Sequence, residues 1–140
     1  MIINNFDENN IDIDKLSSFK KILVVDDILY VVKSISKILT DDGYYVFTAM
    51  TGKEALVVLK KYPIDLITID QKLPDMSGVK LVEEIRKLNI ELFPKIIFIS
   101  AIYDKEEIQS ILTHSVDNFI LKPFKKNKLL EIVNELIKNK

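Results

Sequence analysis

The chain has 140 residues, enough for one domain of ordinary size with a sizeable buried core. Its 20 Lys and Arg residues nearly balance its 21 Asp and Glu residues, and the formal net charge of -1 gives no general attraction to nucleic acid or to an anionic membrane. The absence of cysteine excludes disulfides, cysteine-ligated metal sites and thiol nucleophiles. The three glycines stand too far apart to form a glycine-rich nucleotide-binding loop.

The chain shows no apolar run of the ~20 residues that a membrane-spanning helix needs, and its start lacks the pattern of a signal peptide. We therefore expect a cytoplasmic protein with no membrane insertion and no direct binding of nucleic acid. Residues 1–19 are rich in Asn and Asp with scattered apolar residues, and this composition predicts a flexible N-terminal extension. A docked helix is the alternative for this segment.

From residue 20 onward, short apolar runs alternate with stretches in which apolar residues recur at helical spacing. Gly43 follows the first of these stretches and Pro63 the second, as expected for residues that end helices. The predicted strands are residues 20–25, 44–49, 65–70, 95–100 and 118–121. The predicted helices are residues 28–40, 52–62, 79–88, 104–113 and 125–138.

Five repeats of strand and helix predict an α/β sandwich with a parallel sheet. The first, third and fourth predicted strands are apolar almost throughout, which is typical of strands buried on both faces by covering helices. We expect a flavodoxin-like (βα)5 fold, with five parallel strands in the order 2-1-3-4-5 and helices on both faces of the sheet.

Polar residues stand at the carboxyl ends of four predicted strands. Asp26 and Asp27 follow the first strand, Asp70 ends the third, Ser100 ends the fourth and Lys122 follows the fifth. Open parallel sheets bind ligands at this edge, so the fold would bring these five side chains to one rim.

Three carboxylates in one pocket repel one another, so that either their pKa values rise or a cation joins them. Oxygen ligands without His or Cys favour a hard cation, and Mg²⁺ is the obvious candidate. Lys122 and Ser100 add an ammonium group and a hydroxyl donor. Such a set suits the stabilisation of a phosphoryl group during its transfer to a carboxylate, which would yield an acyl phosphate.

Four motifs in order resemble the receiver domain of two-component response regulators, and in particular its single-domain, chemotaxis-regulator-like members. They are VVDD, ITID followed by LP and SG, FISA and ILKPF, and the resemblance covers residues 20–138. It implies an N-terminal extension of residues 1–19, a receiver domain of residues 20–140 and no output domain.

The resemblance implies that Asp70 is the phosphoacceptor. Asp27 and Asp70 would bind Mg²⁺ directly and Asp26 mainly through water, while the backbone carbonyl of Lys72 would complete the protein ligands. The expected protein is a signalling protein rather than an enzyme, although it would assist its own Mg²⁺-dependent phosphorylation and dephosphorylation.

The resemblance also assigns the remaining site residues. Lys122 and Ser100 would contact the phosphoryl oxygens, and Ser100 and Phe119 would form the switch that responds to phosphorylation. The donor would be a histidine kinase or a histidine phosphotransfer protein, and the phosphorylated form would bind an unidentified downstream protein.

Two departures from the family pattern stand out. Ile28, Leu29 and Tyr30 follow the acidic pair, where polar residues are common, and we interpret them as part of a partner surface, with packing against the N-terminal extension as the alternative. Ser115 stands where relatives usually have glycine, so a positive φ there would strain the backbone by about 1 kcal/mol.

Three other functions stay open. The chain could be a relay intermediate that passes the phosphoryl group onward, or a receiver-like module that binds partners without phosphorylation. A hydrolase that uses an aspartyl phosphate on a related sheet is the third, but such enzymes normally have a second acid two residues after the nucleophile, where this chain has Lys72.

Overall fold

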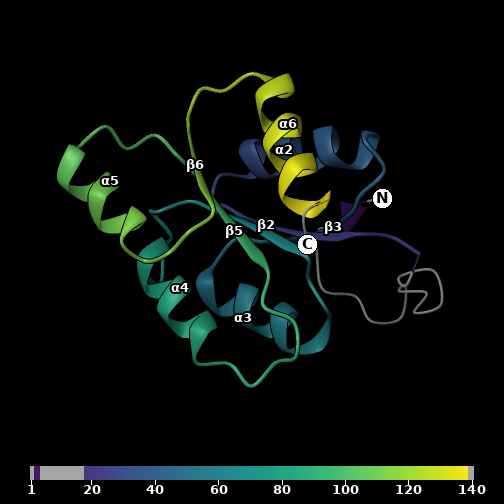
Figure 1. Cartoon of the computed structure of the whole chain (residues 1–140), viewed down its shortest axis with the longest axis horizontal. Helices are drawn as coiled ribbons and strands as arrows, with labels where there is room; N and C mark the ends of the chain where they lie inside the picture. The colour runs from purple at the N-terminus through teal and green to yellow at the C-terminus, as the bar shows by residue number, and fades with distance from the viewer. Residues whose placement is uncertain (1, 4–17, 139–140) are drawn as a thin grey trace.

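A computed structural model of the chain describes residues 2–3 and 18–138, in which strands and helices alternate (Figure 1). The strands are β1 (Ile2–Ile3), β2 (Lys21–Val25), β3 (Tyr45–Ala49), β4 (Leu66–Ile69), β5 (Lys95–Ser100) and β6 (Asn118–Leu121). The helices are α2 (Leu29–Asp41), α3 (Gly52–Lys61), α4 (Gly78–Arg86), α5 (Lys105–Leu112) and α6 (Lys126–Lys138). None of these helices is long and apolar enough to cross a membrane.

All the strands pair in parallel, in the order β1-β3-β2-β4-β5-β6. The five strands β2 to β6 are the five predicted from the sequence, and their order confirms the predicted 2-1-3-4-5 arrangement. Strand β1 was not predicted: it pairs Ile2 and Ile3 with Val46 and Phe47 at the edge of the sheet. The flexibility expected for residues 1–19 concerns mainly residues 1 and 4–17, which lie outside the described residues, and it stays a prediction.

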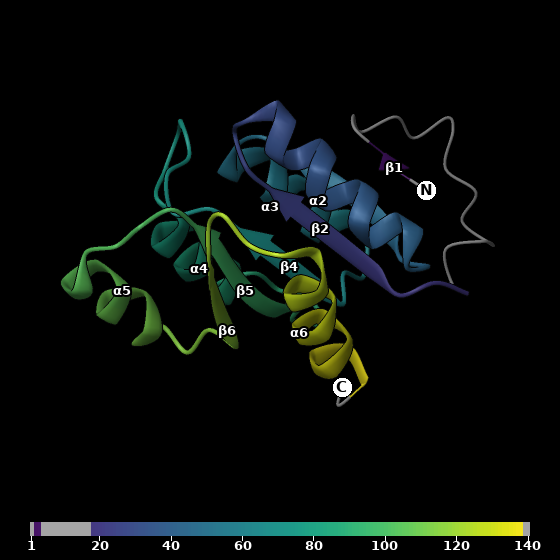
Figure 2. The same ribbon diagram turned by 90° about the horizontal axis from the view of Figure 1, so that it is seen from above.

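Helices cover both faces of the sheet. Figure 1 shows α3 and α4 on one face and α2 and α6 on the other, and Figure 2, seen from above, shows α2 and α6 in front of the strands. Successive residues of a strand point to opposite faces, so Leu23 and Val25 belong to one buried cluster while Ile22 and Val24 belong to the other. The apolar runs of the sequence therefore supply two cores at once.

Local signals place the helix ends within one or two residues of their predicted positions. Thr51 and Ser77 precede α3 and α4, and each side chain accepts a hydrogen bond from a backbone N–H of the first turn, at 3.0 and 3.1 Å. Gly43 follows α2 with φ +97°, a conformation that glycine adopts at little cost. Helix α4 ends at Arg86, two residues earlier than predicted.

The loop between α5 and β6 carries the strained residue that the sequence predicted. Ser115 has φ +60°, and Arg86 of α4 donates a hydrogen bond to its carbonyl oxygen at 3.1 Å. The neighbouring His114 contacts Glu83 of α4 through Nε2 at 3.1 Å, away from the carboxyl-end rim of the sheet. Helix α4 therefore holds the end of α5 through two side chains.

Replacing Ser115 with glycine should stabilise the fold, because glycine adopts φ +60° without the clash of a Cβ atom. The expected gain in the free energy of unfolding is up to about 1 kcal/mol, reduced by the greater freedom of glycine in the unfolded chain. Urea unfolding followed by circular dichroism measures the change. The control is Ser110→Gly inside α5, which should destabilise the protein; a Ser115→Gly variant that loses as much stability as this control would contradict the interpretation.

Candidate functional site

Backbone hydrogen bonds at the strand ends bring the predicted site residues together. The N–H of Asp70 donates to the carbonyl oxygen of Val25 at 3.1 Å, and the N–H of Lys122 donates to that of Ser100 at 2.9 Å. These bonds continue the pairing of β2 with β4 and of β5 with β6 by one residue beyond the strands. The sheet itself thus sets the distances between residues up to 96 positions apart in the sequence.

The ammonium group of Lys122 lies between two of the carboxylates. Its Nζ is 2.6 Å from Oδ2 of Asp26 and 3.1 Å from Oδ2 of Asp70. The second oxygen of Asp70 accepts a hydrogen bond from Oγ of Ser100 at 2.8 Å and a longer one, at 3.4 Å, from the backbone N–H of Lys72. The Asp70 carboxylate is therefore contacted from three sides by donors.

Burial shapes the charges of the site. Asp26 is 1% exposed, and this burial raises the pKa of its carboxyl group, although the hydrogen bond from Lys122 and that from the N–H of Ile28 act in the opposite direction. Burial on its own would lower the pKa of Lys122, but the hydrogen bond and charge of Asp26, together with the charge of Asp70, raise it. Lys122 is therefore held in its charged form.

The three acidic residues can also hold a cation. One carboxylate oxygen each from Asp26, Asp27 and Asp70 lies within 4.8 Å of the others, with Asp27 exposed and the other two buried. When all three are ionised, the single ammonium of Lys122 leaves two negative charges uncompensated. An oxygen-only set with this charge fits a hard divalent cation such as Mg²⁺.

The loop after β4 is a tight hairpin that places Lys72 beside Asp70. Lys72 and Ser77 form an isolated antiparallel bridge, and the N–H of Gly78 donates to the carbonyl oxygen of Gln71 at 2.8 Å. A Cβ atom on Gly78 would lie 2.8 Å from the carbonyl oxygen of Asp70, so the hairpin needs glycine at this position. The close turn holds the backbone of Lys72, the predicted carbonyl ligand, at the rim.

Asp75 anchors the tip of this hairpin to the neighbouring helix. Its two carboxylate oxygens accept hydrogen bonds from the N–H groups of Gly52 and Lys53, at 2.8 and 2.9 Å, at the start of α3. Burial alone would raise the pKa of Asp75. The hydrogen bonds from the two N–H groups outweigh this effect, and the pKa is lowered. The sequence analysis missed this residue, because a contact across 23 positions leaves no periodic signal.

The predicted switch aromatic lies within β6, and the predicted partner residues lie at the start of α2. Phe119 is half-buried, and its ring stacks on that of Phe98 with centroids 6.4 Å apart. Ile28, Leu29 and Tyr30 are exposed by 51%, 50% and 80%. The alternative that they pack against the N-terminal extension concerns residues outside the described part of the chain and stays open.

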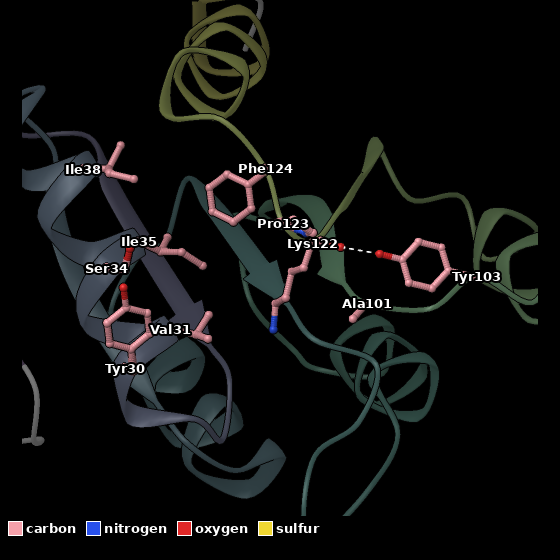
Figure 3. A pocket seen from close by; sticks show the side chains of 10 residues that line it. All are labelled: Tyr30, Val31, Ser34, Ile35, Ile38, Ala101, Tyr103, Lys122, Pro123 and Phe124. Carbon is pink, nitrogen blue, oxygen red and sulfur yellow. Dashed lines mark hydrogen bonds between the residues drawn. The ribbon is translucent and has the colours of Figure 1, made fainter.

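A pocket of about 540 Å³ lies beside these residues, between α2 and the loops that follow β5 and β6. In Figure 3, Tyr30 and Ile35 line it from α2, and Lys122 points into it from the opposite side. Tyr103, in the loop after β5, also lines the pocket and was not identified from the sequence. The pocket therefore joins the exposed start of α2 to the site.

The family model described as "Response regulator receiver domain" matches residues 22–134, most of the chain. The chain belongs to the receiver domain family of response regulators. This family is the one that the four sequence motifs indicated, and proteins of this kind are signalling proteins that bind Mg²⁺ at an acidic pocket.

Similar receivers include chemotaxis proteins. The chain is 35% identical to the chemotaxis protein CheY of Treponema pallidum, over 84% of this chain and 83% of that protein. It is 31% identical to CheY of Thermotoga maritima, over 85% of this chain and 98% of that protein.

Solved receiver structures share the fold. The chemotaxis response regulator CheY4 of Vibrio cholerae superposes with a TM-score of 0.77 at 30% identity, covering 84% of this chain and 98% of that chain. A CheY-like receiver from Methanospirillum hungatei superposes with a TM-score of 0.79 at 33% identity, covering 86% of this chain and 95% of that chain.

Replacing Asp75 with asparagine should destabilise the receiver by about 1 kcal/mol at neutral pH, because one of the two hydrogen bonds and the charge at the start of α3 are lost. Since the pKa of Asp75 is lowered in the folded state, its contribution is present above the ordinary value of 3.8 and is lost as the pH falls through the lowered value. Urea unfolding of wild type and variant between pH 7 and pH 3 measures the difference. A difference that stays constant down to pH 3 would show that the charge of Asp75 plays no part.

Proposed function

We propose that this receiver accepts a phosphoryl group on Asp70 from a histidine kinase or a histidine phosphotransfer protein, and that it signals by binding a protein target in its phosphorylated form. The observation that carries the proposal is the set of donors around Asp70. Lys122 Nζ, Ser100 Oγ and the Lys72 N–H all contact the carboxylate of Asp70, a residue that is 7% exposed at the rim. These groups are placed to bind the oxygens of a phosphoryl group attached there.

Each site residue then has a distinct role. The Asp70 carboxylate attacks the phosphorus atom, and the bond from phosphorus to the donor nitrogen breaks as the acyl phosphate forms. Lys122 offsets the negative charge on the transferred group. Ser100 donates a hydrogen bond to Asp70 in this structure, and its hydroxyl would donate to a phosphoryl oxygen after the transfer. Phe119 stacks on Phe98, which stands two residues before Ser100 on the neighbouring strand, and would respond to the movement of Ser100.

Asp26, Asp27, Asp70 and the backbone carbonyl of Lys72 would hold Mg²⁺. When bound, the ion would neutralise the charge that the phosphoryl group adds to an already acidic pocket. The cluster of three carboxylates, which offers only oxygen ligands, supports this assignment.

The alternatives receive less support from the site. An aspartyl-phosphate hydrolase of the related kind needs a second acid two residues after Asp70, and Lys72 stands there with an exposed side chain. A module that never takes a phosphoryl group has no use for a lysine bound to two buried carboxylates, a costly arrangement to maintain. A relay role is compatible with the same site and differs only in the partner that receives the phosphoryl group.

Incubation with acetyl phosphate and Mg²⁺ should add the mass of one phosphoryl group to the intact protein. The added mass should be absent from Asp70→Asn, and chelation of Mg²⁺ by EDTA should abolish the labelling, because the acidic pocket then repels the donor. Intact-protein mass spectrometry measures both results.

Asp65→Asn serves as the control, since Asp65 lies at the opposite end of β4 and should leave the labelling intact. A wild-type protein that gains no mass would contradict the proposal and favour the phosphorylation-independent module. Rapid turnover of varied phosphate esters would favour the hydrolase.

We also propose that the exposed start of α2 is the surface that meets the phosphodonor protein. Ile28 occupies the N-cap of α2 without a side-chain hydrogen bond to the helix, although Ser, Asp or Asn there would stabilise it. Ile28, Leu29 and Tyr30 are exposed apolar residues beside the pocket that leads to Lys122. Helix stability does not account for these residues, whereas contact with an apolar partner surface does.

The double variant Leu29→Ser/Tyr30→Ser should slow phosphotransfer from the cognate donor about tenfold, since two interface residues lose their apolar contacts. Labelling by acetyl phosphate should not change, because neither side chain contacts Asp70. Rapid-quench transfer assays with both donors measure the two rates. The matched control is Val57→Ser on α3, another exposed apolar residue; equal transfer rates for the double variant and this control would contradict the docking surface.

A further inference from the structure

The main chain of Lys122 is hydrogen-bonded both to the last residue of β5 and to the loop that follows β5. Its N–H donates to the carbonyl oxygen of Ser100 at 2.9 Å, and its own carbonyl oxygen accepts a hydrogen bond from the hydroxyl of Tyr103 at 2.6 Å. The first bond continues the pairing of β5 with β6, but the second comes from a side chain beyond the sheet (Figure 3). Tyr103 thus holds Lys122 at the point where the chain leaves β6.

The pairing with β5 does not hold Lys122 any further than its N–H. Strand β6 ends at Leu121, and the bond from the Lys122 N–H to Ser100 is the last one that continues its pairing with β5 among the described residues. The side chain of Lys122 must nevertheless reach both Asp26 and Asp70, with only 16% of its surface exposed. The direction in which the ammonium points depends on the orientation of the Lys122 backbone, which the Tyr103 hydroxyl restrains.

The placement of Tyr103 is not explained by burial of its ring. Its neighbour Ile102 is 5% exposed and belongs to the core cluster on the α3 and α4 face, so the loop turns Ile102 inward. Tyr103 points outward and is 66% exposed, yet its hydroxyl makes a short, well-defined hydrogen bond. The bond to Lys122, rather than packing, accounts for the orientation of this side chain.

The same loop leads directly into α5. Asp104 follows Tyr103 and is the N-cap of α5, where its side chain accepts a hydrogen bond from the N–H of Glu106 at 2.9 Å. A displacement of Lys122 would therefore be transmitted to the first turn of α5. The path runs through the hydroxyl of Tyr103 and the peptide unit that joins Tyr103 to Asp104.

We propose that Tyr103 is a positioning residue: its hydroxyl orients Lys122 for phosphoryl transfer to Asp70 and ties Lys122 to the start of α5. The proposal rests on the proposed role of Asp70 as phosphoacceptor. Tyr103 does not touch the reacting atoms, and it acts through the backbone of the residue that does. Small errors in the placement of a group that stabilises a transition state reduce the rate strongly.

The test uses Tyr103→Phe, which removes only the hydroxyl from an exposed ring. Labelling of Asp70 by acetyl phosphate with Mg²⁺ should slow about three- to tenfold, because Lys122 is then less well oriented. The unfolding transition should shift little, and urea unfolding checks this point.

A second readout reports on Lys122 without any phosphoryl transfer. Trace acetic anhydride acetylates lysines in proportion to their uncharged, accessible fraction, and peptide mass spectrometry gives the extent at each site. Lys122 has only 16% of its side chain exposed and lies between the carboxylates of Asp26 and Asp70, so it should react slowly in the wild type. In Tyr103→Phe its acetylation relative to the exposed Lys37 should rise at least about threefold, as its contacts loosen.

The matched control is Tyr44→Phe, which removes a tyrosine hydroxyl that donates to Asn134, away from the site. This variant should change neither the labelling rate nor the acetylation of Lys122. If Tyr103→Phe behaves like Tyr44→Phe in both assays, the positioning role is wrong. It is also wrong if Tyr103→Phe slows only the transfer from a protein donor, which would make Tyr103 a partner contact.

Failure of the proposed function would look different. A wild-type protein that takes no phosphoryl group would contradict the proposed role of Asp70 as phosphoacceptor. The acetylation assay would still report whether Tyr103 orients Lys122.

Discussion

The contact of one ammonium group with two buried carboxylates is the constraint on which this site depends. Lys122 lies 2.6 Å from Asp26 and 3.1 Å from Asp70, and burying such groups is costly unless they are paired in this way. Removing one partner of such a set leaves a buried charge uncompensated. The three groups therefore depend on one another, and the oxygen-only acidic cluster that includes Asp27 could hold a divalent cation as well.

The loops around this contact are held by the sheet and by a few specific bonds. Gly78 allows the hairpin after β4 to close against Asp70, and Asp75 fastens the tip of that hairpin to α3. On the other side, the hydroxyl of Tyr103 fastens the loop after β5 to Lys122. Loops that carry ligands are usually the mobile part of a domain, and here each is attached to the neighbouring element at a defined point.

The start of α2 shows a different kind of constraint. Three consecutive apolar residues are exposed at a helix end where polar residues would stabilise the fold. They lie next to the pocket between α2 and Lys122. Fold stability would favour polar residues at this position, whereas the proposed contact with a phosphodonor protein would favour apolar ones.

Much of the architecture follows from the sequence alone. The buried runs of β2, β4 and β5 are apolar because both faces of a covered parallel sheet exclude water, so alternation of these runs with amphipathic helices was enough to predict the strand order. Asp26, Asp27, Asp70, Ser100 and Lys122 could be selected because each stands at a strand end, and strand ends of a parallel sheet meet at one rim. The positive φ at Ser115 was also anticipated, because relatives usually have glycine at this position.

Tertiary structure alone decided which of these groups touch and what restrains them. Nothing local shows that Lys122 contacts Asp26 and Asp70 at once, or that Ser100 binds the second oxygen of Asp70. Asp75 and Tyr103 carry no periodic or motif signal, because their partners lie 22 and 23 positions away in one case and 19 in the other. Such contacts arise from loop conformations, which depend on the packing of the whole domain and not on the pattern of residues along the chain.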